Sequence, residues 1–348
     1  MTTMQDVASL AQVSAKTVSR VYNGDSHVDP DTRARVEAAL ESLNYVPNTM
    51  ATTFRTGQPA AIGVAVPDIA DPFFAAIARA VEDRANERDM AVIISSLSDD
   101  GHGAHEQTIV ESLLRRQLSG LILAPTSSDQ AYLKRWISRT PTVFVDRAPH
   151  NLAADSFVDD DDGGAITATD HLINLGHRRI AFIGDSETIP TTRNRLVGYR
   201  AALDAANIAQ DDNLTVMGAS NRADAAEVLT SLMSRDHPPT ALFLSNARIS
   251  MVCVPVIQQL DLSHLSVVGF GDFPMADALC PPLTVIDQNP SDLGRQAIDR
   301  ILDRIDHPHR RFRRRNILAV QLVKRQSCSP ADHNHRAATP HLRIDNDT

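Results

Sequence analysis

The stretch that most constrains this chain lies near its start, between Asp6 and Arg20. Its apolar residues recur at spacings that give two short helices one shared buried side. These residues are Val7, Ala8, Ala11, Val13, Val18 and Val21. The helices meet over residues 12–14, and Ser14 is the expected N-cap of the second helix. This pattern predicts a helix-turn-helix, and the alternative is an ordinary amphipathic helix pair.

The second helix of a helix-turn-helix offers its outward side chains to DNA. The side chains expected to project away from the buried face and meet base edges are Ala15, Lys16, Ser19 and Arg20. Arginine and lysine donate to guanine O6 and N7, and a small alanine can touch a thymine methyl group. Side chains better suited to phosphate oxygens are Ser14, Thr17 and Asn23. Thr3, just before the first helix, is a further candidate for contact with DNA.

The charge balance argues against a general attraction to nucleic acid. The chain of 348 residues has a net charge of −9. Residues 1–57 hold five basic side chains against six acidic ones, a net charge of −1. Affinity for DNA must therefore come from the placement of individual charges, from backbone amides and from helix N-termini. Non-specific binding is expected to be weak.

A length of 348 residues suggests two or three domains. The composition indicates a globular protein, because 43% of the residues are hydrophobic and 22% are charged. No apolar run approaches the ~20 residues of a membrane span, and no apolar signal segment opens the chain, so a cytoplasmic location is expected. Three cysteines without ligand-like spacing predict neither a disulfide framework nor a zinc site.

The chain divides into four parts. Asp29, Pro30 and Asp31 open a third helix, which completes a helical head over residues 1–45. Residues 46–59 form a connector without a strong hydrophobic period. Residues 60–327 form the core, and residues 328–348 are polar and expected to be disordered.

Short apolar runs alternate with helical stretches through the core. The runs are Ile62–Val66, Ala91–Ile94, Gly120–Ala124, Thr142–Val145, Ile180–Ile183, Ala241–Leu244 and Val267–Phe270, and a final strand is expected over Ile317–Val323. This alternation predicts parallel sheets covered by helices on both faces. There are too many such units for one compact sheet, so we expect two halves that divide near Asp146–Asp162. A ligand is then expected beyond the carboxyl ends of the strands.

Several motifs, in a fixed order over about residues 3–327, resemble the LacI family of bacterial transcriptional regulators. They are Asp6-Val-Ala with Thr17-Val-Ser-Arg20, Thr32–Val36, Asn44–Asn48, Pro67–Phe74, His171–Ile180, Arg195–Tyr199 and Pro281–Thr284. The resemblance implies a small all-α helix-turn-helix head joined to an α/β, two-lobed core like that of periplasmic binding proteins.

The resemblance also implies that residues 46–59 are a hinge that folds into a short helix in the minor groove of operator DNA. Phe54 would be wedged between base steps where the family usually has leucine, and the alternative is that it packs against the core. Asn48, Ala51 and Arg55 would line the same groove. Gln12 is a second departure, because glycine is common in that turn and glutamine adopts it only at some backbone cost.

The resemblance places a small effector between the two lobes. The lining residues, by position in the motifs, would be Phe73, Phe74, Asp146, Thr191, Arg195, Asn246 and Asp272. Arg195 is the strongest candidate, because a guanidinium can hold two ligand oxygens at once. Two carboxylates usual in the family are missing, at Ala247 and Gly271.

Arg193 and Arg248 add positive charge near the same loops. We therefore expect an effector that carries a carboxylate or a phosphate, such as a sugar acid or a sugar phosphate. The alternative is that both arginines point to solvent and the pocket is merely less polar.

Other clusters carry weaker signals. His102 and His105 do not indicate a metal site, and the run Asp159–Asp162 lacks the ligand spacing of a calcium loop. The aspartates are expected to cap a helix from Gly163, and Arg310–Arg315 is expected to be a solvated charge run. The chain shows no recognisable phosphate-binding loop or catalytic triad, so neither an enzyme nor a cofactor is expected.

The sequence thus predicts a dimeric repressor that binds a pseudo-palindromic operator and is gated by a small carbohydrate-like effector. A tetramer is disfavoured, because residues 329–348 contain no leucine heptad. The alternative from another class is a sugar-binding receptor that does not regulate DNA.

Overall fold

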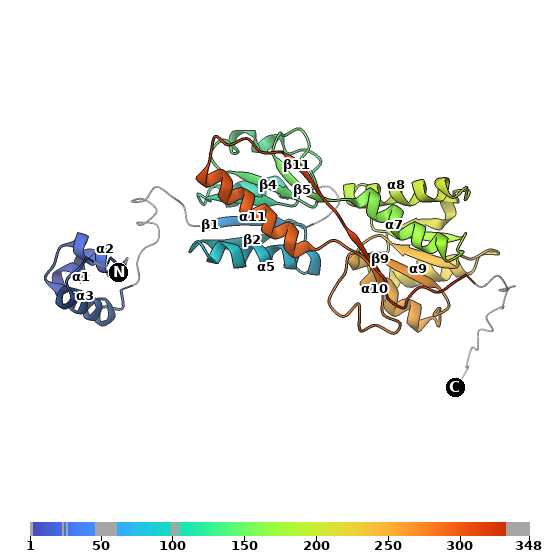
Figure 1. Cartoon of the computed structure of the whole chain (residues 1–348), viewed down its shortest axis with the longest axis horizontal. Helices are drawn as coiled ribbons and strands as arrows, with labels where there is room; N and C mark the ends of the chain where they lie inside the picture. Colours follow the sequence, from blue (N-terminus) through green and yellow to red (C-terminus); the bar gives the residue numbers. More distant parts are fainter. Residues whose placement is uncertain are drawn as a thin grey trace. The chain divides into compact units, whose positions relative to one another are not determined.

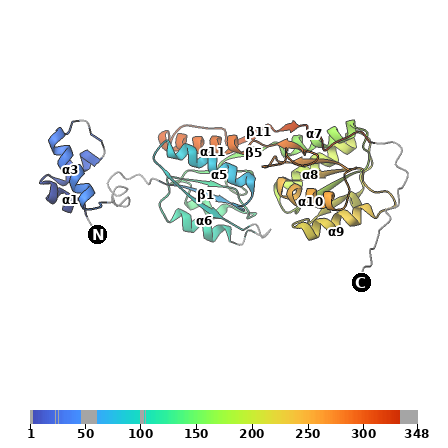
Figure 2. The same ribbon diagram turned by 90° about the horizontal axis from the view of Figure 1, so that it is seen from below.

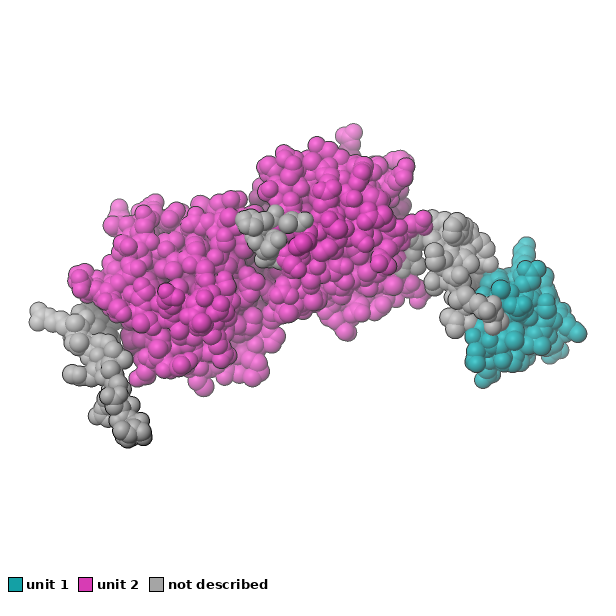
Figure 3. Space-filling model, turned by 180° about the vertical axis from the view of Figure 1, so that it is seen from behind, with its two compact units in different colours: residues 1–60 teal, residues 61–348 magenta. Residues whose placement is uncertain are grey.

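The computed structural model describes residues 3–22, 24–25, 27–45, 61–98, 103 and 105–331. The chain forms two compact units, residues 1–60 and residues 61–348 (Figures 1 and 3). The predicted hinge lies outside the described residues, as do residues 332–348 of the predicted tail. Five candidate DNA contacts therefore also lie outside them, namely Asn23, Asn48, Ala51, Phe54 and Arg55.

The described part of the first unit consists of three short helices, which are α1 (Met4–Ala11), α2 (Ala15–Tyr22) and α3 (Pro30–Ser42). They enclose a small apolar core in which Val7, Val18 and Val36 are fully buried. The side chain of Asp29 caps α3 by accepting a hydrogen bond from the Thr32 N–H, as predicted for the Asp-Pro opening.

The turn between α1 and α2 has the geometry that a helix-turn-helix requires. Gln12 ends α1 in the left-handed conformation, with φ 54°, which confirms that this residue takes the strained turn position. Ser14 caps α2, because its hydroxyl oxygen accepts from the Thr17 N–H at 3.1 Å. The predicted N-cap is therefore confirmed.

The first lobe of the second unit is built on an all-parallel sheet with the strand order β11-β5-β4-β3-β1-β2. Its strands are β1 (Ala61–Val66), β2 (Ala91–Ser96), β3 (Gly120–Leu123), β4 (Thr142–Val145), β5 (Asp155–Asp159) and β11 (Arg315–Leu318). Helices α5 (Pro72–Asn86) and α11 (Pro290–Asp306) lie side by side on one face (Figures 1 and 2). Helix α6 (Glu106–Leu114) and the short 3-10 helix η1 (Ala131–Arg135) cover the other face.

The second lobe repeats this plan with the strand order β12-β10-β9-β8-β6-β7, in which β12 alone runs antiparallel to its neighbour. Its strands are β6 (Ile180–Gly184), β7 (Thr215–Met217), β8 (Ala241–Leu244), β9 (Ser266–Phe270), β10 (Thr284–Asp287) and β12 (Gln321–Val323). One face carries α7 (Asp161–Asn174) and α8 (Pro190–Ala205). The other face carries α9 (Arg222–Met233) and α10 (Ala247–Gln259), and a short 3-10 helix, η2 (Asp212–Leu214), precedes β7.

Three connections join the two lobes. They run from β5 to α7, from β10 to α11 and from β11 to β12. The first falls at Asp160, inside the range predicted for the division of the core. Because the chain passes between the lobes three times, each lobe contains segments that lie far apart in the sequence.

The seven apolar runs between residues 62 and 270 all form strands, as predicted. The expected strand Ile317–Val323 is wrong, because it is two strands. Residues 315–318 pair with β5 in the first lobe, whereas residues 321–323 pair with β10 in the second. Exposed and partly buried residues alternate along this segment, which fits one strand as well as two. The local sequence therefore does not mark the point where the chain crosses from one lobe to the other.

Two expected boundaries also shift. The side chain of Asp160 caps α7 by accepting from the Gly163 N–H, but the helix already begins at Asp161. The first residues of the expected tail are hydrogen-bonded to the second lobe, since the Ser329 N–H donates to Ser266 Oγ at 3.0 Å and the Ala331 N–H donates to the Leu175 carbonyl at 2.8 Å. Residues 328–331 thus continue the core.

None of the helices within the described ranges is long and apolar enough to cross a membrane.

Candidate functional site

The helix α2 presents a small polar surface on the head. Lys16 and Arg20 are exposed, and Ala15 is half-buried against the apolar core. Ser19 is a correction to the prediction, because only 8% of it is exposed and it lies beside Val18 on the buried side. The surface that α2 offers is therefore narrower than the sequence predicted.

Hydroxyl groups mark the start of the first two helices. Thr3 is exposed, and its hydroxyl caps α1 in a capping box with Asp6. The hydroxyls of Ser14 and Thr17 lie 2.9 Å apart on the first turn of α2. Helix N-termini with exposed hydroxyls favour contact with phosphate oxygens, so these positions are compatible with the predicted role.

A cavity of about 50 Å³ lies between the two lobes of the second unit. Much of its lining directly follows strands at their carboxyl ends, where ligands bind in folds of this class. These residues are Asp68 after β1, Asp146 and Arg147 after β4, Asp185 after β6, Asn246 after β8 and Gln288 after β10. Three helices contribute from their N-terminal halves: α5 contributes Phe73 and Phe74, α8 contributes Thr191 and Arg195, and α10 contributes Arg248.

The structure brings seven of the nine predicted effector residues to this cavity. They are Phe73, Phe74, Asp146, Thr191, Arg195, Asn246 and Arg248. Arg193 is exposed on α8 and does not line the cavity. Asp272 does not line it either, because both of its carboxylate oxygens accept from Arg325, at 3.0 and 2.6 Å.

Arg195 is held rigidly at the base of the cavity. Its Nε donates to Asp161 Oδ1 at 2.7 Å, and one terminal nitrogen donates to the Ser245 carbonyl at 2.8 Å. Its guanidinium also stacks on the Phe270 ring, 3.8 Å from the ring centre. Only 4% of the residue is exposed, so Arg195 is a fixed donor rather than a swinging arm.

The other two guanidinium groups of the cavity also face carboxylates. Arg147 Nε lies 3.2 Å from Asp146 Oδ2, and Arg248 lies 3.4 Å from Asp185 Oδ2. Each positive charge in the lining is thereby matched by a negative one. This balance gives the cavity no excess of positive charge.

Asp185 is a central residue that the sequence analysis missed. Its carboxylate accepts hydrogen bonds from the Ser186 N–H at 2.8 Å, from the Thr192 hydroxyl and from the Asn246 amide at 2.9 Å. The position directly after a buried strand is the signal that would have found it, and the same signal marks Asp68 and Gln288.

Two carboxylates lie behind the cavity at the first crossing between the lobes. Burial raises the pKa of Asp159 to about 8, although a hydrogen bond from the Gln288 amide at 2.7 Å opposes the shift. Burial likewise raises the pKa of Asp161 to about 6, and the Arg195 charge opposes it. At the mouth, burial raises the pKa of Asp71, with the Phe73 N–H and the Arg248 charge acting against it.

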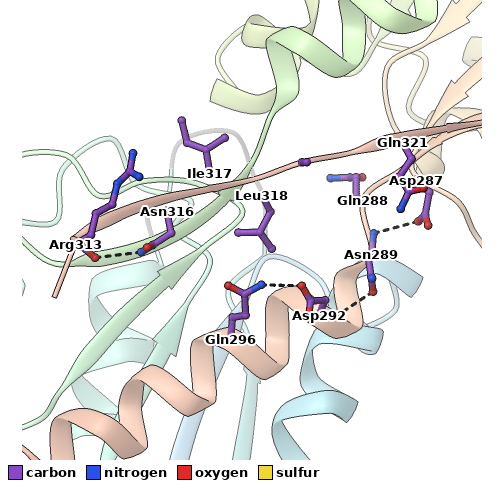
Figure 4. A pocket seen from close by; sticks show the side chains of 11 residues that line it. Asp287, Gln288, Asn289, Asp292, Gln296, Arg313, Asn316, Ile317, Leu318 and Gln321 are labelled. Carbon is purple, nitrogen blue, oxygen red and sulfur yellow. Dashed lines mark hydrogen bonds between the residues drawn. The ribbon is translucent and has the colours of Figure 1, made fainter.

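A second cavity of about 510 Å³ lies along the crossings of the chain between the lobes (Figure 4). Several hydrogen bonds join its lining residues, such as the one that Gln296 donates to Asp292 at 2.7 Å. Of the residues discussed above, Gln288 lines both cavities. Over the described ranges, no three histidine, cysteine or acidic side chains gather in a way that could hold a metal ion.

Comparison with known proteins identifies the family. Residues 3–48 match the family model described as bacterial regulatory proteins, lacI family, and residues 169–328 match the periplasmic binding protein-like domain. The ribose operon repressor of Escherichia coli (strain K12) is 33% identical over 314 residues, which cover 88% of this chain and 94% of the relative. This chain belongs to the LacI family. It is a DNA-binding transcriptional repressor and not an enzyme.

Other members of the LacI family agree over most of the chain. The repressor PurR of Haemophilus influenzae (strain PittEE) is 30% identical over 312 residues, 88% of this chain and 92% of the relative. The lac repressor dimer bound to operator and the anti-inducer ONPF has a TM-score of 0.81 at 29% identity, covering 94% of this chain and 98% of that one. A putative ribose operon repressor from Burkholderia thailandensis has a TM-score of 0.67 at 29% identity, covering 76% and 99%.

Proposed function

We propose that this LacI-family protein is a cytoplasmic homodimer whose affinity for a pseudo-palindromic operator changes when a small neutral sugar binds between the lobes of its core. The observation that carries the proposal is the cavity lined by strand ends from both lobes. A ligand held there contacts both lobes at once, so its binding energy depends on how the lobes are arranged. The lac repressor dimer bound to operator supports the dimeric part of the proposal.

The lining chemistry suits a sugar. Carboxylates at Asp68 and Asp146 accept hydrogen bonds from hydroxyl groups, and the amides of Asn246 and Gln288 both donate and accept. Two aromatic rings at the start of α5, whose centres lie 5.1 Å apart, supply an apolar wall for the carbon face of a sugar ring. A solved complex of the regulator CelR with cellobiose supports a neutral sugar as the ligand. Relatives named ribose operon repressors make D-ribose the first sugar to test.

The charge pairing favours a neutral ligand over the sugar acid or sugar phosphate expected from the sequence. Arg195, Arg147 and Arg248 each face a carboxylate, and Arg193 lies outside the cavity. One observation keeps the anionic ligand as a second candidate. The Arg248 side chain is 40% exposed and pairs with Asp185 only at 3.4 Å, so it is the guanidinium that an incoming anion would engage most easily.

The cavity is too small for a sugar in this structure. Small-molecule pockets typically measure about 300–1,000 Å³, whereas this cavity measures about 50 Å³. Binding therefore requires the lobes or the rim to move. Asp71 from the first lobe and Arg248 from the second both line the cavity, and the Arg248 charge acts to lower the pKa of Asp71, so we expect a change in the distance between these two groups to accompany the movement.

On the DNA side, we propose that the exposed surface of α2 reads base edges through Lys16 and Arg20. Ala15 would face a base edge nearby, and the exposed hydroxyls at the start of the first two helices would hold phosphates. Those hydroxyls belong to Thr3 and Ser14, and the hydroxyl of the half-buried Thr17 lies beside that of Ser14. The contacts predicted for the hinge remain predictions.

Titration calorimetry on the full chain would test the ligand. The panel is D-ribose, D-glucose, a sugar acid (gluconate) and a sugar phosphate (ribose 5-phosphate). The proposal expects binding of a neutral sugar, and binding of an anionic member alone would contradict it. Arg248→Ala should weaken an anionic ligand by about tenfold or more but a neutral one far less, because only the anion loses a charge partner. Arg193→Ala is the matched control and should bind as the wild type does.

A further inference from the structure

The exposed face of α2 is extended by one acidic residue in the turn that follows it. Asp25 Oδ2 accepts a hydrogen bond from Arg20 Nε at 2.8 Å. This is a side-on contact, because Nε lies on one edge of the planar guanidinium. The two terminal nitrogens form the end of the guanidinium and make no hydrogen bond to another described residue, which leaves that end available.

Asp25 is itself fixed at several points. Its Oδ1 accepts from the His27 N–H at 2.9 Å, and its backbone carbonyl accepts from Arg33, on α3, at 2.6 Å. Its own N–H donates to the Arg20 carbonyl at 3.0 Å. The Asp25 carboxylate therefore has a defined position relative to both α2 and α3.

The ion pair between Arg20 and Asp25 is better suited to orienting the Arg20 side chain than to stabilising the fold. Both side chains are partly exposed, and ion pairs between exposed side chains contribute little to folding. The hydrogen bonds from Arg20 and from the His27 N–H hold the pKa of Asp25 well below its usual range, so the carboxylate stays charged in physiological buffers. Arginine loses less freedom on contacting a guanine when its side chain is already held in the required direction.

We propose that Asp25 is a positioning residue that aims the terminal nitrogens of Arg20 at O6 and N7 of a guanine, and so sets sequence selectivity without contacting DNA. Bidentate contact with guanine uses the end of the guanidinium that Asp25 leaves available. The inference rests on the proposed function, in which α2 reads the operator. The competing possibility is that Asp25 only repels DNA through its charge.

Four variants of the full chain separate these possibilities. Asp25→Asn removes the charge with little change in shape, and Asp25→Glu keeps the charge but moves the carboxylate. Glu37→Gln removes one exposed charge elsewhere on the head, on α3, as the matched control. Arg20→Ala removes the proposed base reader.

The measurement is the ratio of affinities, by fluorescence anisotropy, for two duplexes. One is the best site that the wild-type protein selects from random DNA, and the other is a scrambled duplex of the same composition. We expect Asp25→Asn and Asp25→Glu each to lower the ratio by about tenfold or more, the size of one impaired guanine contact. Glu37→Gln should leave the ratio unchanged. Circular dichroism melting shows whether each variant is folded. If Asp25→Asn does not fold, the affinity ratio of Asp25→Glu alone tests the inference.

A second readout isolates the guanine. Each guanine of the half-site is replaced in turn by 7-deazaguanine, which lacks the N7 acceptor. The replacement that weakens the wild type but not Arg20→Ala identifies the contacted base. At that base, both Asp25 variants should be less sensitive to the replacement than the wild type, an effect that a purely structural role would not produce.

Two results would overturn the inference in distinguishable ways. If Asp25→Glu behaves as the wild type and Asp25→Asn tightens both duplexes equally, as Glu37→Gln does, then Asp25 acts only through its charge. If Arg20→Ala keeps the wild-type ratio, then Arg20 does not read the operator, and that part of the proposed function fails together with the inference.

Discussion

At the scale of single residues, the most unusual group is the Asp159 carboxylate. It is 5% exposed, and its Oδ1 has no hydrogen-bond partner among the described residues. Burial raises its pKa to about 8, from an ordinary value of 3.8. Between about pH 4 and pH 8, the Asp159 carboxyl group therefore keeps its proton in the native protein but has lost it in the unfolded chain. Stability falls as the pH rises from about 4 to about 8, and the loss is complete above pH 8.

Asp159→Asn cannot ionise and keeps an oxygen that can accept from the Gln288 amide. We expect the variant to exceed the wild type in free energy of unfolding by roughly 2 kcal/mol or more at pH 9 and to differ little at pH 4. Urea unfolding of the core at the two pH values measures this. Asp236→Asn, at an exposed position, is the control. An equal effect of Asp159→Asn at both pH values would show that the buried carboxylate is not the cause.

The sequence predicted the cavity unevenly at this scale. Residues that the family motifs mark, such as Arg195 and Asn246, lie where expected. Asp272 does not, because the arginine that binds it, Arg325, lies 53 residues further along the chain. The burial of Ser19 was missed for a similar reason, since it depends on how the three helices of the head pack together.

At the scale of elements, the turn between α1 and α2 is where local backbone preference and the fold disagree. Gln12 holds φ 54°, a conformation that glycine adopts without strain. We expect Gln12→Gly to stabilise the head by about 0.5–1 kcal/mol, because the strain is relieved. Hydrogen exchange of the α2 amides reports on the head separately from the core.

Gln5→Gly is the matched control for this turn, since Gln5 is an exposed position inside α1. It should destabilise the head by less than about 0.5 kcal/mol, because glycine weakens a helix but Gln5 lies in the first turn of α1 and not in its middle. Faster exchange in Gln12→Gly would mean that the Gln12 side chain contributes more than its backbone strain costs.

Elements were predicted well where their pattern is local. Continuous apolar strands such as β1 and β8 stand out, whereas β5 reads Asp-Ser-Phe-Val-Asp and is nevertheless buried throughout. The polar residues at its ends can be buried because other side chains of the folded core bind them. Asp155, for example, forms an ion pair with Arg304 at 2.9 Å. Pairing of this kind is set by the tertiary structure and leaves no trace in the local sequence.

At the scale of the whole molecule, the central claim is that one chain couples a sugar cavity to operator DNA. The family shows the two functions, and the cavity shows where a ligand can contact both lobes. Coupling between two sites is reciprocal. If a sugar changes the affinity of the protein for the operator by a given factor, the operator must change the affinity for the sugar by the same factor.

The most direct test measures both sides of that coupling on the full-length protein. Anisotropy gives the affinity for the selected operator duplex with and without a saturating sugar, and calorimetry gives the sugar affinity with and without the duplex. We expect D-ribose or another neutral sugar to change operator affinity by about tenfold or more, with an equal change in sugar affinity. A sugar that binds the core and leaves operator affinity unchanged would contradict this coupling.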